Sequence, residues 1–283
     1  MVAPEVIRER AAWSERTGPD LRTADGGPLC PASGGSVWVE EVTTHARLAA
    51  LRPAWDRLFA QAETASPFNA WLWLATWWDV FGQDKHLRIF VVWEHERAIA
   101  IAPFYTLRYR LGPLHLRALL PMGYGNDLTE RLEMLVAAGR RADAIGGLSA
   151  HLAARRRGRW DLVLWAGITR AELPPALQRL VHREDLLPYE SRPVPPAWPE
   201  LVRGLSKSMR DNLSYYPRLL ARHGHTVHTR IVTAPQELGP ALAEFERLHR
   251  ARAQCPDTIP HADRFGVPAH QDFLQRIAPV LAA

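Results

Sequence analysis

Two basic side chains and an amide gather where a helix is expected to begin. Lys207, Arg210 and Asn212 follow Ser206, a residue type that caps helix N-termini. Backbone N–H groups at a helix start and neighbouring Lys and Arg side chains bind anions. From Arg203 to Arg230 there are six basic residues and one acidic residue, a net charge of +5. We predict that these side chains bind an anionic sugar, phosphate or nucleotide; the alternative is a solvated basic helix face.

His249 is the best-placed candidate for proton transfer. It follows Leu248 at the edge of the apolar face of a predicted helix over Pro235–Ala253. An imidazole there can act as general base for an amine or hydroxyl nucleophile, although a lone helix histidine is more often structural. The histidines at 223, 225 and 228 have no carboxylate partner close in sequence, so no metal site is predicted.

The segment from Ser66 to Gly82 holds four of the 11 tryptophans. Its apolar residues recur at helical spacing on nearly every face, which is typical of a buried core helix. Pro67 fits the first turn and Gly82 fits a stop after the helix. As an alternative to a core role, Trp73 and Trp77, four residues apart, would wall a ligand cleft.

Composition limits the class of protein. The chain has 283 residues, 47% of them hydrophobic, with a net charge of +5 and a pI of about 9.6. This mild basic excess favours anionic ligands and falls short of a DNA-binding arm. Two cysteines, Cys30 and Cys255, cannot build a disulfide framework. Without a membrane-spanning apolar run or a secretory signal, we expect a soluble cytoplasmic protein.

Periodicity predicts an α/β fold with two units. Residues 1–36 are expected to be a disordered leader. A first unit over 37–172 reads as strand, two helices, hairpin, strand, helix and strand, and a strand–helix–strand end implies a parallel pair. Pro103 predicts a bulge or strand start within the hairpin. A Pro-rich connection over 173–199 leads to a second unit from 200 to 283.

The second unit is expected to repeat the opening of the first. A helix opening near Leu205 precedes a strand over Val227–Val232, which is followed by helices over Pro235–Ala253 and Phe265–Ala283. The central strands of the first unit have no counterpart before Ala283, so the unit is predicted to be incomplete. We expect two similar units facing a cleft, and poor stability because the apolar residues Phe245, Phe273 and Ile277 have little sheet to cover them.

Three segments resemble one family. They are the Ser66–Gly82 helix, Leu205-Ser-Lys-Ser-Met-Arg-Asp-Asn-Leu213, and Phe245-Glu-Arg-Leu-His-Arg-Ala-Arg252. In this order they resemble the BioF2-like or CelD-like (cellulose-biosynthesis-type) GNAT acetyltransferases, which are related to the FemAB-like aminoacyl transferases of peptidoglycan bridges. The resemblance spans about Val37 to Ala283 and implies tandem GNAT-like units.

The resemblance also implies a function and further site residues. The expected activity is acyl transfer from acyl-CoA, such as acetyl-CoA, to an amine or hydroxyl of a sugar, polysaccharide or cell-envelope precursor. The loop Gly123-Tyr-Gly-Asn-Asp127 lacks a dinucleotide fingerprint and is well explained as a turn. In this family such a loop faces the cleft, so Tyr124 and Asn126 are substrate-binding candidates and Asp127 joins His249 as a catalytic candidate.

The family's basic Gly-rich donor loop is missing, and its equivalent in the second unit would lie beyond Ala283. Two alternatives therefore stay open. One is an aminoacyl-tRNA-dependent FemAB-like transferase, which the basic stretch Arg203 to Arg230 would suit. The other is a non-catalytic sugar- or partner-binding accessory module of exopolysaccharide synthesis, which the missing loop favours.

Overall fold

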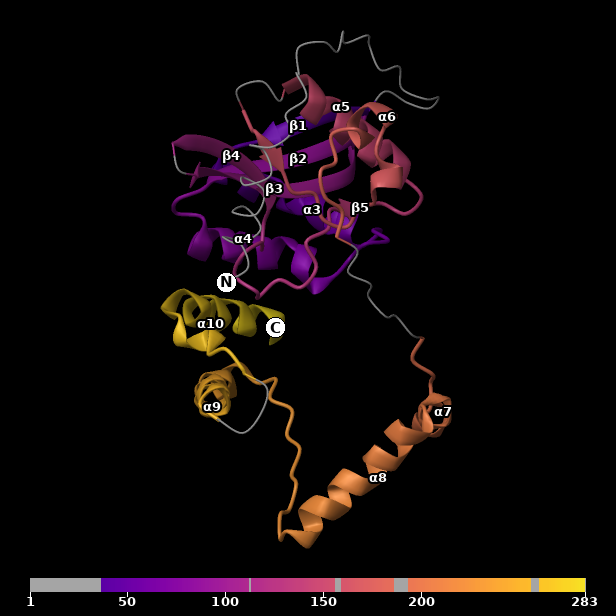
Figure 1. Ribbon diagram of the computed structural model, residues 1–283, viewed down its shortest axis with the longest axis vertical. Coiled ribbons are helices and arrows are strands. Elements are labelled where there is room, and N and C mark those ends of the chain that lie inside the picture. The colour runs from indigo at the N-terminus through magenta and orange to yellow at the C-terminus, as the bar shows by residue number, and fades with distance from the viewer. Residues whose placement is uncertain (1–36, 112, 156–158, 186–192, 256–259, 283) are drawn as a thin grey trace. The chain divides into compact units, whose positions relative to one another are not determined.

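The computed structural model describes residues 37–111, 113–155, 159–185, 193–255 and 260–282 (Figure 1). The predicted leader and Cys30 lie outside these residues. Two compact units are present: Met1–Glu184 together with Pro235–Ala283, and Asp185–Ala234. The sequence places residues 235–283 in a second unit, whereas here they belong with the first.

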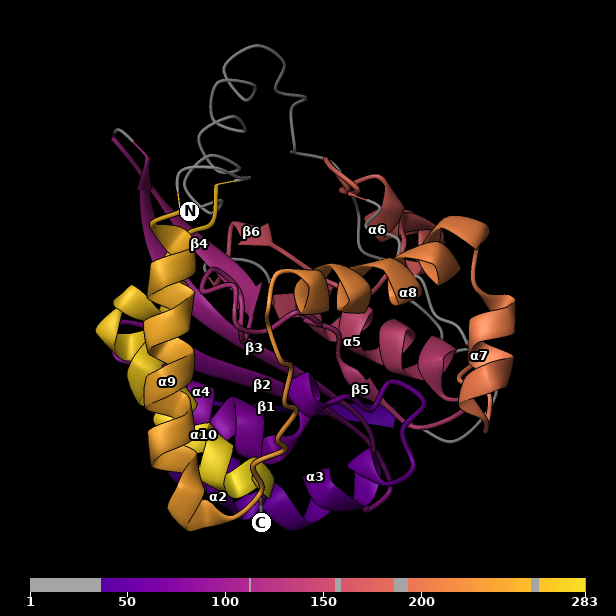
Figure 2. The same cartoon turned by 90° about the horizontal axis from the view of Figure 1, so that it is seen from below.

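The first unit contains a mixed sheet with helices on both faces (Figure 2). Its strands are β1 (Val37–Val42), β2 (His86–Glu94), β3 (Arg97–Leu111), β4 (Leu114–Pro121), β5 (Leu135–Val136) and β6 (Leu162–Val163). Its α-helices are α2 (His45–Ala50), α3 (Arg52–Phe59), α4 (Trp71–Phe81), α5 (Arg141–Arg155), α6 (Pro175–Gln178), α9 (Pro235–Ala253) and α10 (Pro268–Ala282). Short 3₁₀ turns are η1 (Pro67–Asn69), η2 (Arg170–Glu172) and η3 (Arg264–Gly266). The predicted mixed α/β class is confirmed.

The sheet has the order β1-β2-β3-β4-β6, and β5 pairs with β3. All pairs are antiparallel except β4 with β6, which confirms the predicted parallel pair at the end of the unit. The predicted break at Pro103 is wrong, because β3 runs through it unbroken. Pro103 lies where β3 changes partner from β5 to β4, so its missing N–H removes no ladder hydrogen bond there.

Two apolar cores form because side chains alternate across each strand. On one face Ile89 and Tyr105 pack with Trp55 of α3 and Trp77 of α4. On the other face Phe90, Phe104 and Leu119 pack with Ile145 and Leu148 of α5. The first of the two helices predicted after β1 is divided at Leu51 into α2 and α3, and α3 begins with Arg52-Pro53.

The Trp-rich segment forms the predicted helix, with a later start. The Asn69 side chain accepts the Ser66 N–H at 2.9 Å in the 3₁₀ turn η1, and Ala70 is extended, so α4 begins at Trp71. Gly82 ends the helix as predicted, and a Cβ there would lie 2.5 Å from the Trp78 carbonyl oxygen. Figures 1 and 2 show α10 alongside α4.

Helix α10 changes the expected exposure of the C-terminal apolar residues. Phe273 and Ile277 are both 2% exposed, because Phe273 packs against Trp73 and Phe81 of α4. Phe245 on α9, in contrast, is 45% exposed. The expectation that all three lack cover is therefore wrong for Phe273 and Ile277, because α10 packs on the apolar helix α4.

The second unit contains α7 (Trp198–Gly204) and α8 (Lys207–Arg222). The predicted strand over Val227–Val232 is wrong: this segment is irregular, and Val227 and Ile231 are 67% and 83% exposed. With no neighbouring strand among the described residues of this unit, an isolated strand cannot form a ladder. In all the described segments, no helix is both long and apolar enough to span a bilayer.

Candidate functional site

The loop that follows β4 has an unusual backbone. Gly123 and Gly125 have φ near +90°, and Asp127 has φ of +55°. A Cβ at Gly123 would lie 2.5 Å from the Cβ of Thr129, so only glycine fits there. Aspartate tolerates positive φ better than most residues, and such conformations concentrate at functional sites. The loop therefore restrains the backbone at Asp127, in the loop after β4.

Arg264 of η3 forms an ion pair with that carboxylate. The two residues are 137 positions apart in the chain, and their side chains are 43% and 39% exposed. A second ion pair joins Arg250 of α9 to Asp263, with 3.5 Å between Nε and Oδ2. The loop after β4 is thus connected to the segment between α9 and α10.

His249 lies beside this ion pair on α9. Its Nε2 accepts the backbone N–H of Arg264 at 3.2 Å in one tautomer, or donates to the Ala262 carbonyl at 3.2 Å in the other. Its Nδ1 is 3.4 Å from Nε2 of His261. Both ring nitrogens of His249 are therefore engaged by protein atoms, whereas His261 is exposed.

The predicted catalytic pair, Asp127 and His249, is brought into one cluster through Arg264. The aromatic rings of Phe245 and Phe265 support the His249 ring, with centroids at 5.9 Å and 4.9 Å. Because an oriented imidazole can hold a second imidazole in a chosen tautomer, the His249–His261 pair can transfer a proton at the surface.

Tyr124 and Asn126 lie in the same loop but face inward. Tyr124 is half-buried against the first core, and its carbonyl accepts the Tyr105 hydroxyl at 3.4 Å. Asn126 is 9% exposed and its Oδ1 accepts the Leu128 N–H at 3.3 Å. Its Nδ2 is buried and has no hydrogen-bond partner within the described part of the chain. Their expected contact with substrate stays a prediction.

Trp73 and Trp77 are core residues in this structure. Trp77 is 1% exposed and packs between Phe81 and Tyr105. Trp73 is half-buried, lies edge-on against Phe273 and donates its indole N–H to the Thr129 hydroxyl at 3.1 Å. The core interpretation of this helix therefore describes these two side chains better than a ligand cleft does.

Lys207, Arg210 and Asn212 are exposed on α8, in the other unit. Lys207 pairs with Asp211 at 3.0 Å, and Arg210 donates to the backbone carbonyls of Leu205 and Arg203. Arg210 thus binds the last carbonyls of α7, a role that its position in the sequence did not indicate. Their predicted place in a cleft stays a prediction, because each unit is described by itself.

Arg264 and His261 are the site residues that sequence reasoning missed. Pro260 and Gly266 bracket them and are turn residues, but no spacing connects this segment with residue 127. Among the described residues, no three His, Cys, Asp or Glu side chains gather as metal ligands. Comparisons of the chain with models of protein families, with curated proteins and with solved structures find no match.

Proposed function

We propose that the first unit is a GNAT-like acyltransferase that moves an acyl group from acyl-CoA to an amine or hydroxyl of a sugar or cell-envelope precursor. One observation carries the proposal: an exposed histidine, backed by a second histidine and an ion pair, lies beside the loop after β4. The parallel β4–β6 pair beside that loop supports it, since the sequence resemblance implies the same order of elements.

In this proposal His261 is the general base and His249 is a positioning residue. His261 accepts the proton of the acceptor nitrogen or oxygen as that atom attacks the thioester carbonyl carbon. The C–S bond breaks, the new amide or ester forms, and the thiolate takes a proton from His261. Arg264 holds the loop through Asp127. The Ala262 carbonyl accepts the Nε2–H of His249, so Nδ1 of His249 accepts the Nε2–H of His261 and Nδ1 of His261 is the basic nitrogen.

The test is release of free thiol from acetyl-CoA in the presence of glucosamine, measured with a thiol reagent. We expect His261→Ala to lower the rate about 100-fold, the size of a lost general base. His115→Ala, which removes an exposed histidine of β4, is the matched control and should retain full activity. Equal rates for the wild type and His261→Ala would reject this assignment.

A non-catalytic glycan-binding module is the second candidate, because both nitrogens of His249 are engaged by the protein. The same assay separates the two functions. Binding of glucosamine by calorimetry without any thiol release from acetyl-CoA would favour the binding module.

A further inference from the structure

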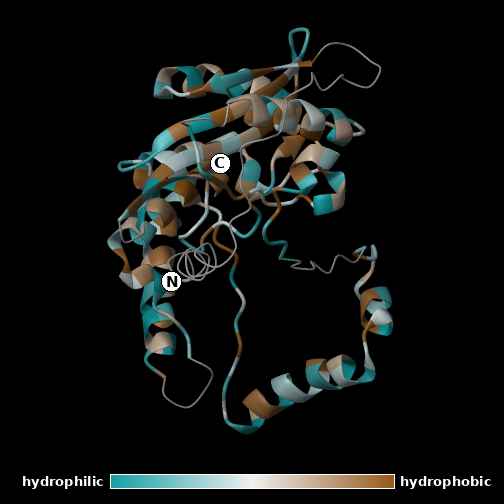
Figure 3. Ribbon diagram, turned by 45° about the horizontal axis from the view of Figure 1, so that its top comes forward, coloured by the Kyte–Doolittle hydropathy of each residue, from teal (hydrophilic) through white to brown (hydrophobic). Residues whose placement is uncertain are grey.

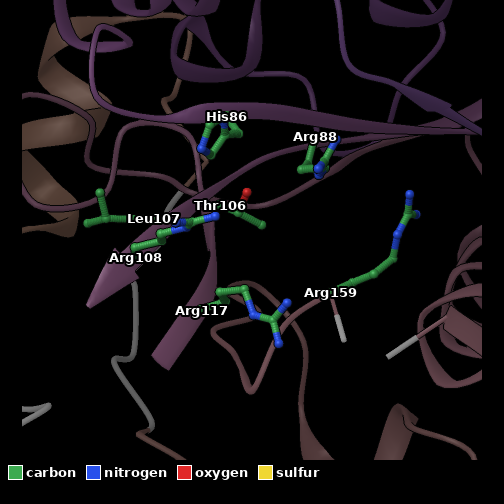
Figure 4. Close-up of a pocket in the computed structure, with 7 residues that line it drawn as sticks. All are labelled: His86, Arg88, Thr106, Leu107, Arg108, Arg117 and Arg159. Atoms are coloured by element: carbon green, nitrogen blue, oxygen red, sulfur yellow. The ribbon is translucent and has the colours of Figure 1, made fainter. Parts of the chain in front are cut away.

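A strongly basic cavity lies on the α5 side of the sheet, near the start of β4. Its volume is about 320 Å³, and Figure 4 shows its side chains, which come from three strands and the segment after α5. It is lined by His86, Arg88, Thr106, Leu107, Arg108, Arg117 and Arg159. The candidate site, in contrast, includes the loop that follows the end of β4, so this cavity is separate from it.

The alternation of the strands explains why the polar residues from the strands, unlike Leu107, share one face. Arg88 is two residues before Phe90, Thr106 and Arg108 follow Phe104, and Arg117 precedes Leu119 by two. Phe90, Phe104 and Leu119 belong to the core under α5. The cavity therefore continues that core face beyond the helix, where apolar side chains give way to cationic ones.

Three of the four arginines in the cavity form ion pairs with two carboxylates. Glu41, with a side chain 7% exposed, pairs with Arg159 and with Arg88, whose Nε is 3.4 Å from Oε1. Asp161 pairs with Arg117 at 3.6 Å. Within the described segments Arg108 has no ion-pair or hydrogen-bond partner. The four arginines therefore outnumber these two carboxylates by two.

Two of these arginines lie next to each other across the sheet. Arg108 and Arg117 are directly opposite each other on β3 and β4, and like charges in that position destabilise a sheet. A bound dianion would offset this repulsion. The guanidinium groups of arginine match the oxygens of a phosphate in two-point hydrogen bonds.

We propose that this cavity binds the phosphate group of a small soluble phosphate ester. A phosphate monoester carries about −1.5 to −2 charges at pH 7, which matches the excess of two arginines. Arg108 and Arg117 are its direct ligands, and the Thr106 hydroxyl lines the same cavity. Glu41 is a positioning residue that orients Arg88 and Arg159. This inference goes beyond the acyl-transfer proposal and does not depend on it.

The experiment is calorimetric titration of the full chain with inorganic phosphate at pH 7.5 and low salt. We expect Arg108→Gln to weaken phosphate binding about tenfold or more, as loss of a charged hydrogen bond does. Arg57→Gln is the matched control, because Arg57 is also exposed, has no partner within the described segments and lies on α3. It should change the affinity less than about twofold.

Arg108→Lys, which keeps the charge, should give an intermediate affinity because the two-point contact is lost. Circular dichroism checks that each variant is folded. Absence of phosphate binding by the wild type, or equal losses in Arg108→Gln and Arg57→Gln, would overturn the proposal.

A second experiment uses vesicles of phosphatidylcholine with phosphatidic acid. If the protein sediments with these vesicles in an Arg108-dependent way but does not bind free phosphate, the cavity binds a lipid headgroup. That result would also overturn the proposal of a soluble phosphate ester.

Discussion

At the scale of the single residue, the side chain and the backbone of Arg264 contact different partners. Its guanidinium pairs with Asp127, and its backbone N–H is 3.2 Å from Nε2 of His249. A substitution of the side chain removes the first contact and leaves the second in place. The proposed site therefore allows effects on stability and on activity to be separated.

We expect Arg264→Gln to lower the free energy of unfolding by less than about 1 kcal/mol, because half-exposed ion pairs contribute little. Acyl transfer should fall about tenfold or more, since the loop after β4 loses its anchor. Urea denaturation and the thiol-release assay measure the two effects. A large loss of stability with unchanged activity would show that the ion pair has only a structural role.

Titration of Glu172 should be visible in the pH dependence of the free energy of unfolding. It accepts hydrogen bonds from Arg141 and from the N–H and hydroxyl of Thr169, and the bond from Arg141 is the main cause that lowers its pKa from 4.5 to about 2. A depressed pKa means that the folded state favours the carboxylate. The stabilisation is therefore complete above the unfolded pKa of about 4.5 and is lost as the pH falls towards 2.

We expect Glu172→Gln to lower the free energy of unfolding at pH 7 by about 1–2 kcal/mol, after allowance for solvent screening of a side chain that is partly exposed. Between pH 4.5 and 2, the variant should lose less stability than the wild type. Urea denaturation across this range measures both effects. Glu96→Gln, in the exposed turn between β2 and β3, is the control and should keep the wild-type slope.

At the scale of the element, α10 acts as the cover of α4. Phe273 contacts Trp73 and Phe81, and both Phe273 and Ile277 are 2% exposed. Helix α4 is apolar on nearly every face, so it needs cover on the side away from the sheet. Phe273 is 192 positions from Phe81 and 200 from Trp73, so the cover comes from a distant part of the chain.

Phe273→Ala should lower the free energy of unfolding by about 3–5 kcal/mol, as removal of a buried aromatic ring does. Val280→Ala on the same helix is the control; Val280 is 37% exposed, so we expect a loss of about 1 kcal/mol or less. Thermal and urea unfolding give both values. Similar small losses for the two variants would show that α10 does not stabilise α4.

At the scale of the whole molecule, the two units differ in how much they bury. The central strands β2 and β3 are largely buried, whereas α8 has no buried residue. In Figure 3 the ribbon of α8 carries hydrophobic and hydrophilic residues side by side. Met209, Leu213, Tyr216 and Leu220 are all at least 40% exposed.

We expect the amides of α8 to exchange with deuterium at least about 100-fold faster than those of β2 and β3. A helix without buried residues opens easily, whereas central strands open only with the whole unit. Hydrogen exchange read by mass spectrometry measures both regions in one sample. Protection of α8 equal to that of β2 would mean that another surface covers its apolar residues.

Local pattern alone determined much of the first unit. The hairpin, the parallel pair and the Trp-rich helix with its Gly82 end could be predicted, because alternation and helical spacing report which side of an element is buried. Asp127 and His249 could be named as candidates from their residue types and the family resemblance. The strand at 227–232 could not be judged locally, since a strand depends on neighbours that the pattern does not show.

Only the tertiary structure decided which distant residues meet. It placed α10 on α4, paired Arg264 with Asp127 and set His261 beside His249, contacts that no spacing in sequence encodes. It also aligned Arg108 with Arg117, because strand register sets the neighbours of each side chain across the sheet. Sequence periodicity describes which face of an element is apolar, but the partner of that face is chosen by packing of the whole chain.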